Sequence, residues 1–111
     1  MNHEKLMSYK ALLTLAQGLA KRVSRWPRGY GYLADQLRRA MASTLLNLAE
    51  GNGRKRFGAD RRRFFDISRG SIAEVAACLD LAHAFGLMTE NDKEYDQSLL
   101  KLASVKINAL P

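Results

Sequence analysis

The spacing of apolar residues is the feature that most constrains the fold of this chain. Leucine and other apolar residues recur at steps of three and four over four long stretches. An α-helix turns once in about 3.6 residues, so this spacing collects the apolar side chains on one helix face. No stretch shows the alternation typical of a β-strand, and the prolines stand at positions 27 and 111. We therefore expect helices over about residues 3–25, 32–50, 59–85 and 90–109.

Four helices joined by short turns predict an all-α fold, an antiparallel up-down-up-down four-helix bundle. The chain has 111 residues, so we expect a single domain that covers positions 1–111. The third helix carries the small residues Ser68, Gly70 and Ser71 where bulky ones would be usual. These residues predict a close approach of the third helix to another helix.

The ends of the helices have recognisable signals. Trp26-Pro27 ends the first helix, because the residue before proline avoids the α region. Gly51-Asn52-Gly53 is expected to supply the left-handed positions at the end of the second helix. Thr89 with Asp92 three residues later resembles a capping pattern at the start of the fourth helix.

The second expected helix is apolar on two faces. One stripe contains Leu37 and Leu45, and another contains Leu46 and Ala49. Such a helix is usually covered on both sides, here by its own bundle and by a second subunit. We therefore expect a homo-oligomer.

Positive charge is concentrated in two parts of the chain, whose net charge is +7. Such clusters favour nucleic acid as a ligand, because lysine and arginine neutralise phosphates. An excess of acidic residues between positions 74 and 96 leaves another interpretation open, in which basic patches meet an acidic partner or a neighbouring subunit. The candidate phosphate contacts are Arg54, Lys55, Arg56, Arg61, Arg62 and Arg63, with Lys21, Arg22, Arg25 and Arg28 as a second patch.

Phenylalanines lie beside the basic residues of the first patch. Phe57 follows Arg56 directly, and Phe64 and Phe65 follow Arg63. An exposed aromatic ring in such a cluster can stack on a nucleic-acid base. We expect Phe64 and at least one neighbour to lie in the core instead.

Residues typical of catalysis are few, and we expect a protein that is not an enzyme and has no metal or cofactor. The two histidines, His3 and His83, have no second ligand at metal spacing. Cys78 is expected to be a buried structural thiol. Neither the Walker-type nor the dinucleotide glycine motif is present. The polar residues of the second and third helices are assigned to a structural cluster of Asn47, Glu50, Ser71 and Glu74.

The apolar runs of the sequence are short. They do not approach the roughly 18–20 residues that span a bilayer. The first residues, MNHEKLMSYK, lack the apolar centre of a signal peptide. We therefore expect a cytoplasmic protein without a membrane span.

Two segments carry a resemblance to a known family. They are Asn47-Leu48-Ala49-Glu50-Gly51 before the basic segment, and Phe64-Phe65-Asp66-Ile67-Ser68-Arg69-Gly70-Ser71 with Glu74 after it. This pattern resembles the 23S rRNA-intervening-sequence family, in which an N-[IL]-A-E-G turn and a basic segment precede an A-x-G-S-x-x-E run. Ser68 stands where alanine is common in that family. The resemblance extends over nearly the whole chain.

The resemblance implies a four-helix bundle that assembles into a homopentamer. A related branch, the accessory variability determinants of diversity-generating retroelements, forms positively charged pentamers that bind a reverse transcriptase and nucleic acid. The first hypothesis is therefore a non-catalytic accessory protein that binds RNA or DNA, with RNA expected, and assists a reverse transcriptase. The second is a protein–protein adaptor or structural oligomer whose basic patch docks an acidic protein.

Overall fold

The computed structural model describes residues 3–110 and contains four α-helices. They are α1 (His3–Val23), α2 (Gly31–Asn52), α3 (Ala59–Ala84) and α4 (Glu90–Asn108). No strand occurs in this part of the chain, so the all-α prediction is confirmed. α1 is shorter than expected, because the chain already turns after Val23 and Trp26 N donates to the Val23 carbonyl at 3.1 Å.

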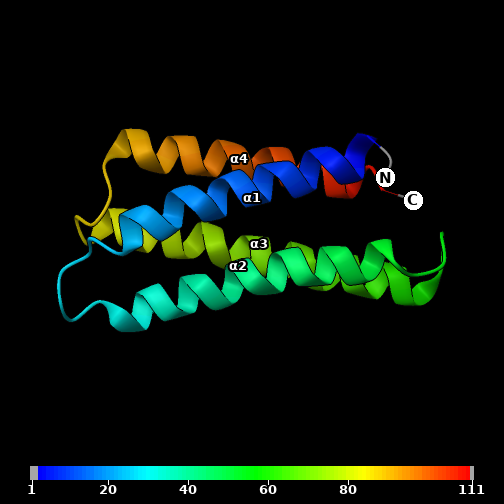
Figure 1. Ribbon diagram of the computed structural model, residues 1–111, viewed down its shortest axis with the longest axis horizontal. Coiled ribbons are helices and arrows are strands. Elements are labelled where there is room, and N and C mark those ends of the chain that lie inside the picture. Colours follow the sequence, from blue (N-terminus) through cyan, green and yellow to red (C-terminus); the bar gives the residue numbers. More distant parts are fainter. Residues whose placement is uncertain (1–2, 111) are drawn as a thin grey trace.

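The helices form two closely packed pairs. α2 packs most extensively against α3, and α1 packs against α4, whereas α1 and α2 contact each other much less. Figure 1 shows the α1–α2 and α3–α4 connections at one end of the molecule and the α2–α3 connection at the other. We call these the α3–α4 end and the α2–α3 end. The molecule measures 44 × 23 × 18 Å, and the helix packing is consistent with a bundle.

Apolar side chains from all four helices fill the core. Leu12 of α1, Leu37 of α2, Leu79 of α3 and Ile107 of α4 are each at most 1% exposed. Burial of one such side chain contributes about 1.5–3 kcal/mol to folding. The stripes that the spacing predicts therefore meet in one shared core.

Small residues bring α2 and α3 close together. Ser68 is buried, and its hydroxyl donates to the Thr44 carbonyl at 2.7 Å. The hydroxyls of Ser43 and Ser71 lie 2.6 Å apart. The expected close approach is confirmed at positions 68 and 71. Gly70 is exposed, and a Cβ there would meet no atom within 4 Å.

The glycines at the end of α2 differ from the expectation. Gly51 is helical and buried, and Gly53 has a φ of −83°, so the expected left-handed glycine is wrong. A Cβ on Gly51 would lie 2.5 Å from the ring of Phe65. Gly51 therefore makes room for an aromatic side chain of α3. The left-handed residue of the α2–α3 connection is Phe57, with a φ of 64°.

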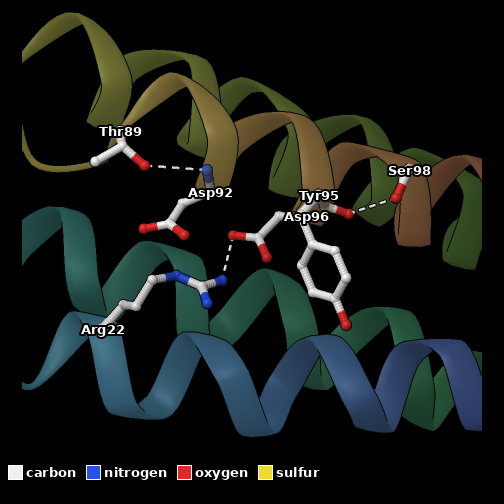
Figure 2. Close-up of polar contacts among 6 residues, drawn as sticks. All are labelled: Arg22, Thr89, Asp92, Tyr95, Asp96 and Ser98. Atoms are coloured by element: carbon white, nitrogen blue, oxygen red, sulfur yellow. Dashed lines mark hydrogen bonds and ion pairs between the residues drawn. The ribbon is translucent and has the colours of Figure 1, made fainter.

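An ion pair between Arg22 of α1 and Asp96 of α4 joins these helices (Figure 2). The side chain of Asp96 is 1% exposed and that of Arg22 is 22% exposed. Burial raises the pKa of the Asp96 carboxyl, and the hydrogen bond and charge of Arg22 oppose this rise. Gly18 leaves room for the pair, because a Cβ there would lie 3.1 Å from Arg22 Nη1. Figure 2 also shows the expected cap of α4, where Asp92 N donates to Thr89 Oγ1 at 3.1 Å.

Candidate nucleic-acid interface

The two predicted basic patches lie at opposite ends of the molecule. Residues 54–63 form the α2–α3 connection and the start of α3, whereas residues 21–28 lie at the end of α1 and in the connection that follows (Figure 1). The longest extent of the molecule is 44 Å. The patches therefore form two separate surfaces of one chain.

Five of the six residues in the first patch are exposed. We call this surface the basic end, and it consists of Arg54, Lys55, Arg56, Arg62 and Arg63, together with Phe57. Within the described chain, its ion pairs are Arg54 with Glu50 at 3.2 Å and Arg63 with Asp60 at 3.8 Å. All four of these side chains are exposed, and such pairs contribute only about 0–1 kcal/mol. A phosphate can therefore replace either carboxylate at little cost.

Aromatic rings lie under three guanidinium groups of the basic end. Arg54 Cζ and Arg63 Cζ lie 5.1 and 4.8 Å from the ring centroid of Phe64. Arg56 Cζ lies 5.0 Å from the ring centroid of Phe57. These cation–π contacts, worth about 0.5–1 kcal/mol each at exposed sites, favour a fixed position of the guanidinium groups. Phe64 is half-buried beneath two of them.

Arg61 does not belong to this exposed surface. It is 3% exposed, its Nη1 donates to the Arg54 carbonyl at 3.2 Å, and its Cζ lies 5.0 Å from the ring centroid of the buried Phe65. Burial, and secondarily the charge of Arg56, lowers the pKa of Arg61. The burial of Arg61 leaves little of its guanidinium accessible to a phosphate. Its side chain instead ties the connection to the first turn of α3.

The α2–α3 connection holds Phe57 at the surface in an unfavourable backbone conformation. The side chain is 66% exposed, although left-handed φ values are rare for bulky residues. Arg62 Nη1 donates to the Phe57 carbonyl at 2.6 Å, and Gly58 N donates to the Lys55 carbonyl at 2.9 Å. A Cβ on Gly58 would lie 2.9 Å from that same oxygen. Contacts on both sides of Phe57 therefore hold its conformation.

Lys5 of α1, which is not among the predicted basic patches, also belongs to the α2–α3 end. Burial, followed by the charges of Arg61 and Arg56, lowers the pKa of its ammonium group. About fifty positions separate Lys5 from these arginines along the chain, so their proximity has no signal in local sequence. Lys5 adds a positive charge next to the basic end.

The second patch lies among acidic residues. Lys21, Arg25 and Arg28 are exposed, but Arg22 is paired with the buried Asp96. This pairing occupies part of the guanidinium of Arg22 and makes it a weaker candidate for phosphate contact than its three neighbours. The acidic residues in the range 80–94 lie at the same α3–α4 end (Figure 1). Their charge weakens the attraction of this patch for a polyanion.

The predicted polar cluster forms only in part. Asn47 Nδ2 donates to the carbonyl and the hydroxyl of Ser43, at 2.8 and 3.2 Å, and Ser43 in turn contacts Ser71. Ser43, which was not among the predicted cluster residues, connects the two residues. Glu50 and Glu74 are not part of this group and contact Arg54 and Gln36 respectively.

Within residues 3–110, no three His, Cys, Asp or Glu side chains lie close enough together to hold a metal ion. His83 Nε2 lies 2.9 Å from Glu90 Oε2. Cys78 is buried as expected, and burial, followed by the charge of Glu74, raises the pKa of its thiol. None of the helices in these residues combines the length and hydropathy of a membrane span.

These features define a small all-α protein with a basic surface around the connection between its second and third helices. The family model for the 23S rRNA-intervening sequence protein matches residues 4–109. This match covers nearly the whole chain, so the chain belongs to that family. No curated protein matches the chain.

Proposed function

We propose that this protein is a non-catalytic accessory protein that binds nucleic acid, with RNA as the preferred ligand, through the basic end. The observation that carries this proposal is the cluster of five exposed basic side chains around an exposed Phe57. Their ion pairs within the described chain are solvent-exposed and weak. Phosphate binding by such groups releases counterions, so affinity is largely independent of sequence and falls steeply with salt.

The second patch contributes less to the proposed nucleic-acid binding than the basic end does. Lys21, Arg25 and Arg28 are free to contact phosphates, but the acidic residues of α3 and α4 lie at the same end. The net field there is weak. These three residues can contact a nucleic acid that is already bound at the basic end, provided that it is long enough to reach the opposite end.

The proposed functional unit is a homo-oligomer of antiparallel up-down-up-down bundles, a pentamer by the family resemblance. The alternation of the connections between the two ends supports this bundle order (Figure 1). Leu46 of α2 is 63% exposed, and Ala42 and Ala49 on the same helix are also exposed. An apolar groove of about 330 Å³ lies between α1 and α2. Light scattering should give five times the chain mass, and a monomer at all concentrations would contradict the assembly.

Assistance to a reverse transcriptase is the proposed cellular role, and it follows from the family resemblance alone. The basic end would hold RNA template or product DNA close to the enzyme. Co-purification of a reverse transcriptase that depends on the basic-end residues would support this role.

The alternative is a protein–protein adaptor or structural oligomer whose basic patch docks an acidic protein. The apolar groove between α1 and α2 favours it, because Leu45, Met41 and Leu19 line a surface suited to a partner helix, with Arg38 beside it. A protein partner that stays bound after nuclease treatment would favour the adaptor over the nucleic-acid function.

A matched pair of charge reversals tests the proposed function. Lys55→Glu/Arg56→Glu changes the basic end, and Arg25→Glu/Arg28→Glu makes the same change in charge at the α3–α4 end. We expect the first variant to lose most of its affinity for structured RNA and the second to lose much less. Circular dichroism checks that both keep the helical content of the wild type. Equal losses in the two variants would show that net charge alone, and not the basic end, determines binding.

A further inference from the structure

Phe57 combines high exposure, a positive φ and a basic surrounding, and neither packing nor net charge explains this combination. It is the most exposed large apolar side chain of the described residues, at 66%. It is also the one non-glycine residue among them with a positive φ. Single exposed apolar residues are common on protein surfaces. An exposed phenylalanine in a disfavoured backbone conformation, surrounded by basic side chains, is a more specific arrangement.

The surrounding residues hold the ring outward. Arg62 binds the Phe57 carbonyl from α3, and the Gly58–Lys55 hydrogen bond closes the turn around it. The guanidinium of Arg56 lies over the ring, and most of the side chain remains open to solvent. The ring is therefore presented at the end of the molecule within a group of exposed basic side chains.

We infer that Phe57 is a stacking platform for an unpaired base, and that the basic end therefore prefers single-stranded nucleic acid or unpaired loops to a regular duplex. This inference rests on the proposed function and specifies its ligand. A base in a duplex is stacked on its neighbours and offers no free face to a protein ring. An unpaired base can stack on Phe57 while Lys55, Arg56 and Arg62 contact the adjacent phosphates.

The test compares a single-stranded oligonucleotide with a duplex of the same length by fluorescence anisotropy. Phe57→Asn removes the ring but suits the left-handed backbone, because asparagine tolerates positive φ. Phe57→Tyr keeps the ring. Stacking of one base predicts a loss of about fivefold or more in single-strand affinity for Phe57→Asn, and little change for the duplex. Phe57→Tyr should bind as the wild type does.

A control and a direct signal separate stacking from general damage to the surface. Phe85→Ala removes an exposed ring at the α3–α4 end and should leave both affinities unchanged. Phe57→Trp places a fluorophore on the platform, and the single strand should quench its emission by stacking. Wild-type protein contains only Trp26, which belongs to the α1–α2 connection at the opposite end, and should show little quenching.

The outcomes distinguish this inference from the proposed function. Equal losses for single strand and duplex in Phe57→Asn would overturn stacking, because the ring would then support the loop and not a base. Unchanged binding by Phe57→Asn, with Lys55→Glu/Arg56→Glu weakening both ligands, would overturn stacking and leave the proposed function intact. Absence of binding by the wild type would overturn both.

Discussion

Removal of Arg22 should destabilise the protein strongly, because it leaves the carboxylate of Asp96 buried without a partner. Figure 2 shows the guanidinium of Arg22 reaching from α1 to the acidic residues of α4. Loss of one partner of a buried ion pair costs about 3–5 kcal/mol. Arg22 is 22% exposed, so water partly solvates the pair. For Arg22→Met we therefore expect the free energy of unfolding to fall by about 3 kcal/mol near neutral pH, at the low end of that range.

The double variant Arg22→Met/Asp96→Leu should recover most of this loss. Asp96 Oδ1 and Arg22 Nε have no hydrogen-bond partner within the described chain, so the pair is incompletely satisfied. Replacing a buried pair by apolar groups of similar size is often neutral or stabilising. We expect the free energy of unfolding of the double variant to lie within about 1 kcal/mol of that of the wild type. Urea unfolding, followed by circular dichroism at one fixed protein concentration, measures all three proteins.

The pH dependence gives a second check on the same pair. Burial raises the pKa of Asp96 above its ordinary value of 3.8, so the folded state takes up the proton more readily than the unfolded state. The contribution of Asp96 to stability is therefore greatest at low pH and declines as pH rises through its folded pKa. Without Arg22 this pKa rises further, so the deficit of Arg22→Met should shrink in mild acid. Near neutral pH, a loss of unfolding free energy below about 1 kcal/mol for Arg22→Met, or a double variant no more stable than Arg22→Met, would refute this account of the pair.

Three further measurements test the fold. Gly51→Ala should destabilise by about 1–3 kcal/mol in urea unfolding, because its Cβ would lie 2.5 Å from the Phe65 ring; an unchanged midpoint would mean that the ring moves freely. Thr89→Ala should cost about 1 kcal/mol by removing the cap on Asp92 N, whereas Thr89→Ser should retain it. Cys78 should react with a thiol reagent more slowly than a free thiol at neutral pH, because burial raises its pKa; rapid labelling of the folded protein would contradict its burial.

The helices could be predicted from sequence because the pattern that defines them is local. The apolar spacing and the Thr89 cap are signals between residues only a few positions apart in the sequence. The bounds of the four observed helices agree closely with those expected from these signals. Gly51 shows the limit of such reasoning. Glycine suggests a turn by itself, but its role here depends on Phe65 of the next helix, which packs where a Cβ would stand.

The candidate site was predictable as a cluster but not as individual side chains. Residues 61–63 are all arginines, yet helix geometry buries Arg61 and exposes its two neighbours. In the sequence, Arg22 looks like its basic neighbours. It differs from them because the fold pairs it with Asp96, which is 74 positions away in the chain. Contacts over such separations depend on tertiary packing, and no local pattern indicates them.

Binding across a salt series tests the central claim most directly. The five basic side chains of the basic end, if all contact phosphates, predict a slope of log affinity against log salt of about −3.5 per chain for single strands. Lys55→Glu/Arg56→Glu should reduce the magnitude of this slope by about 1.4 or more, whereas Arg25→Glu/Arg28→Glu should change it little. The account predicts this difference between the two ends. A folded protein that binds neither RNA nor DNA at low salt, or a slope unaffected by the basic-end variant, would contradict it.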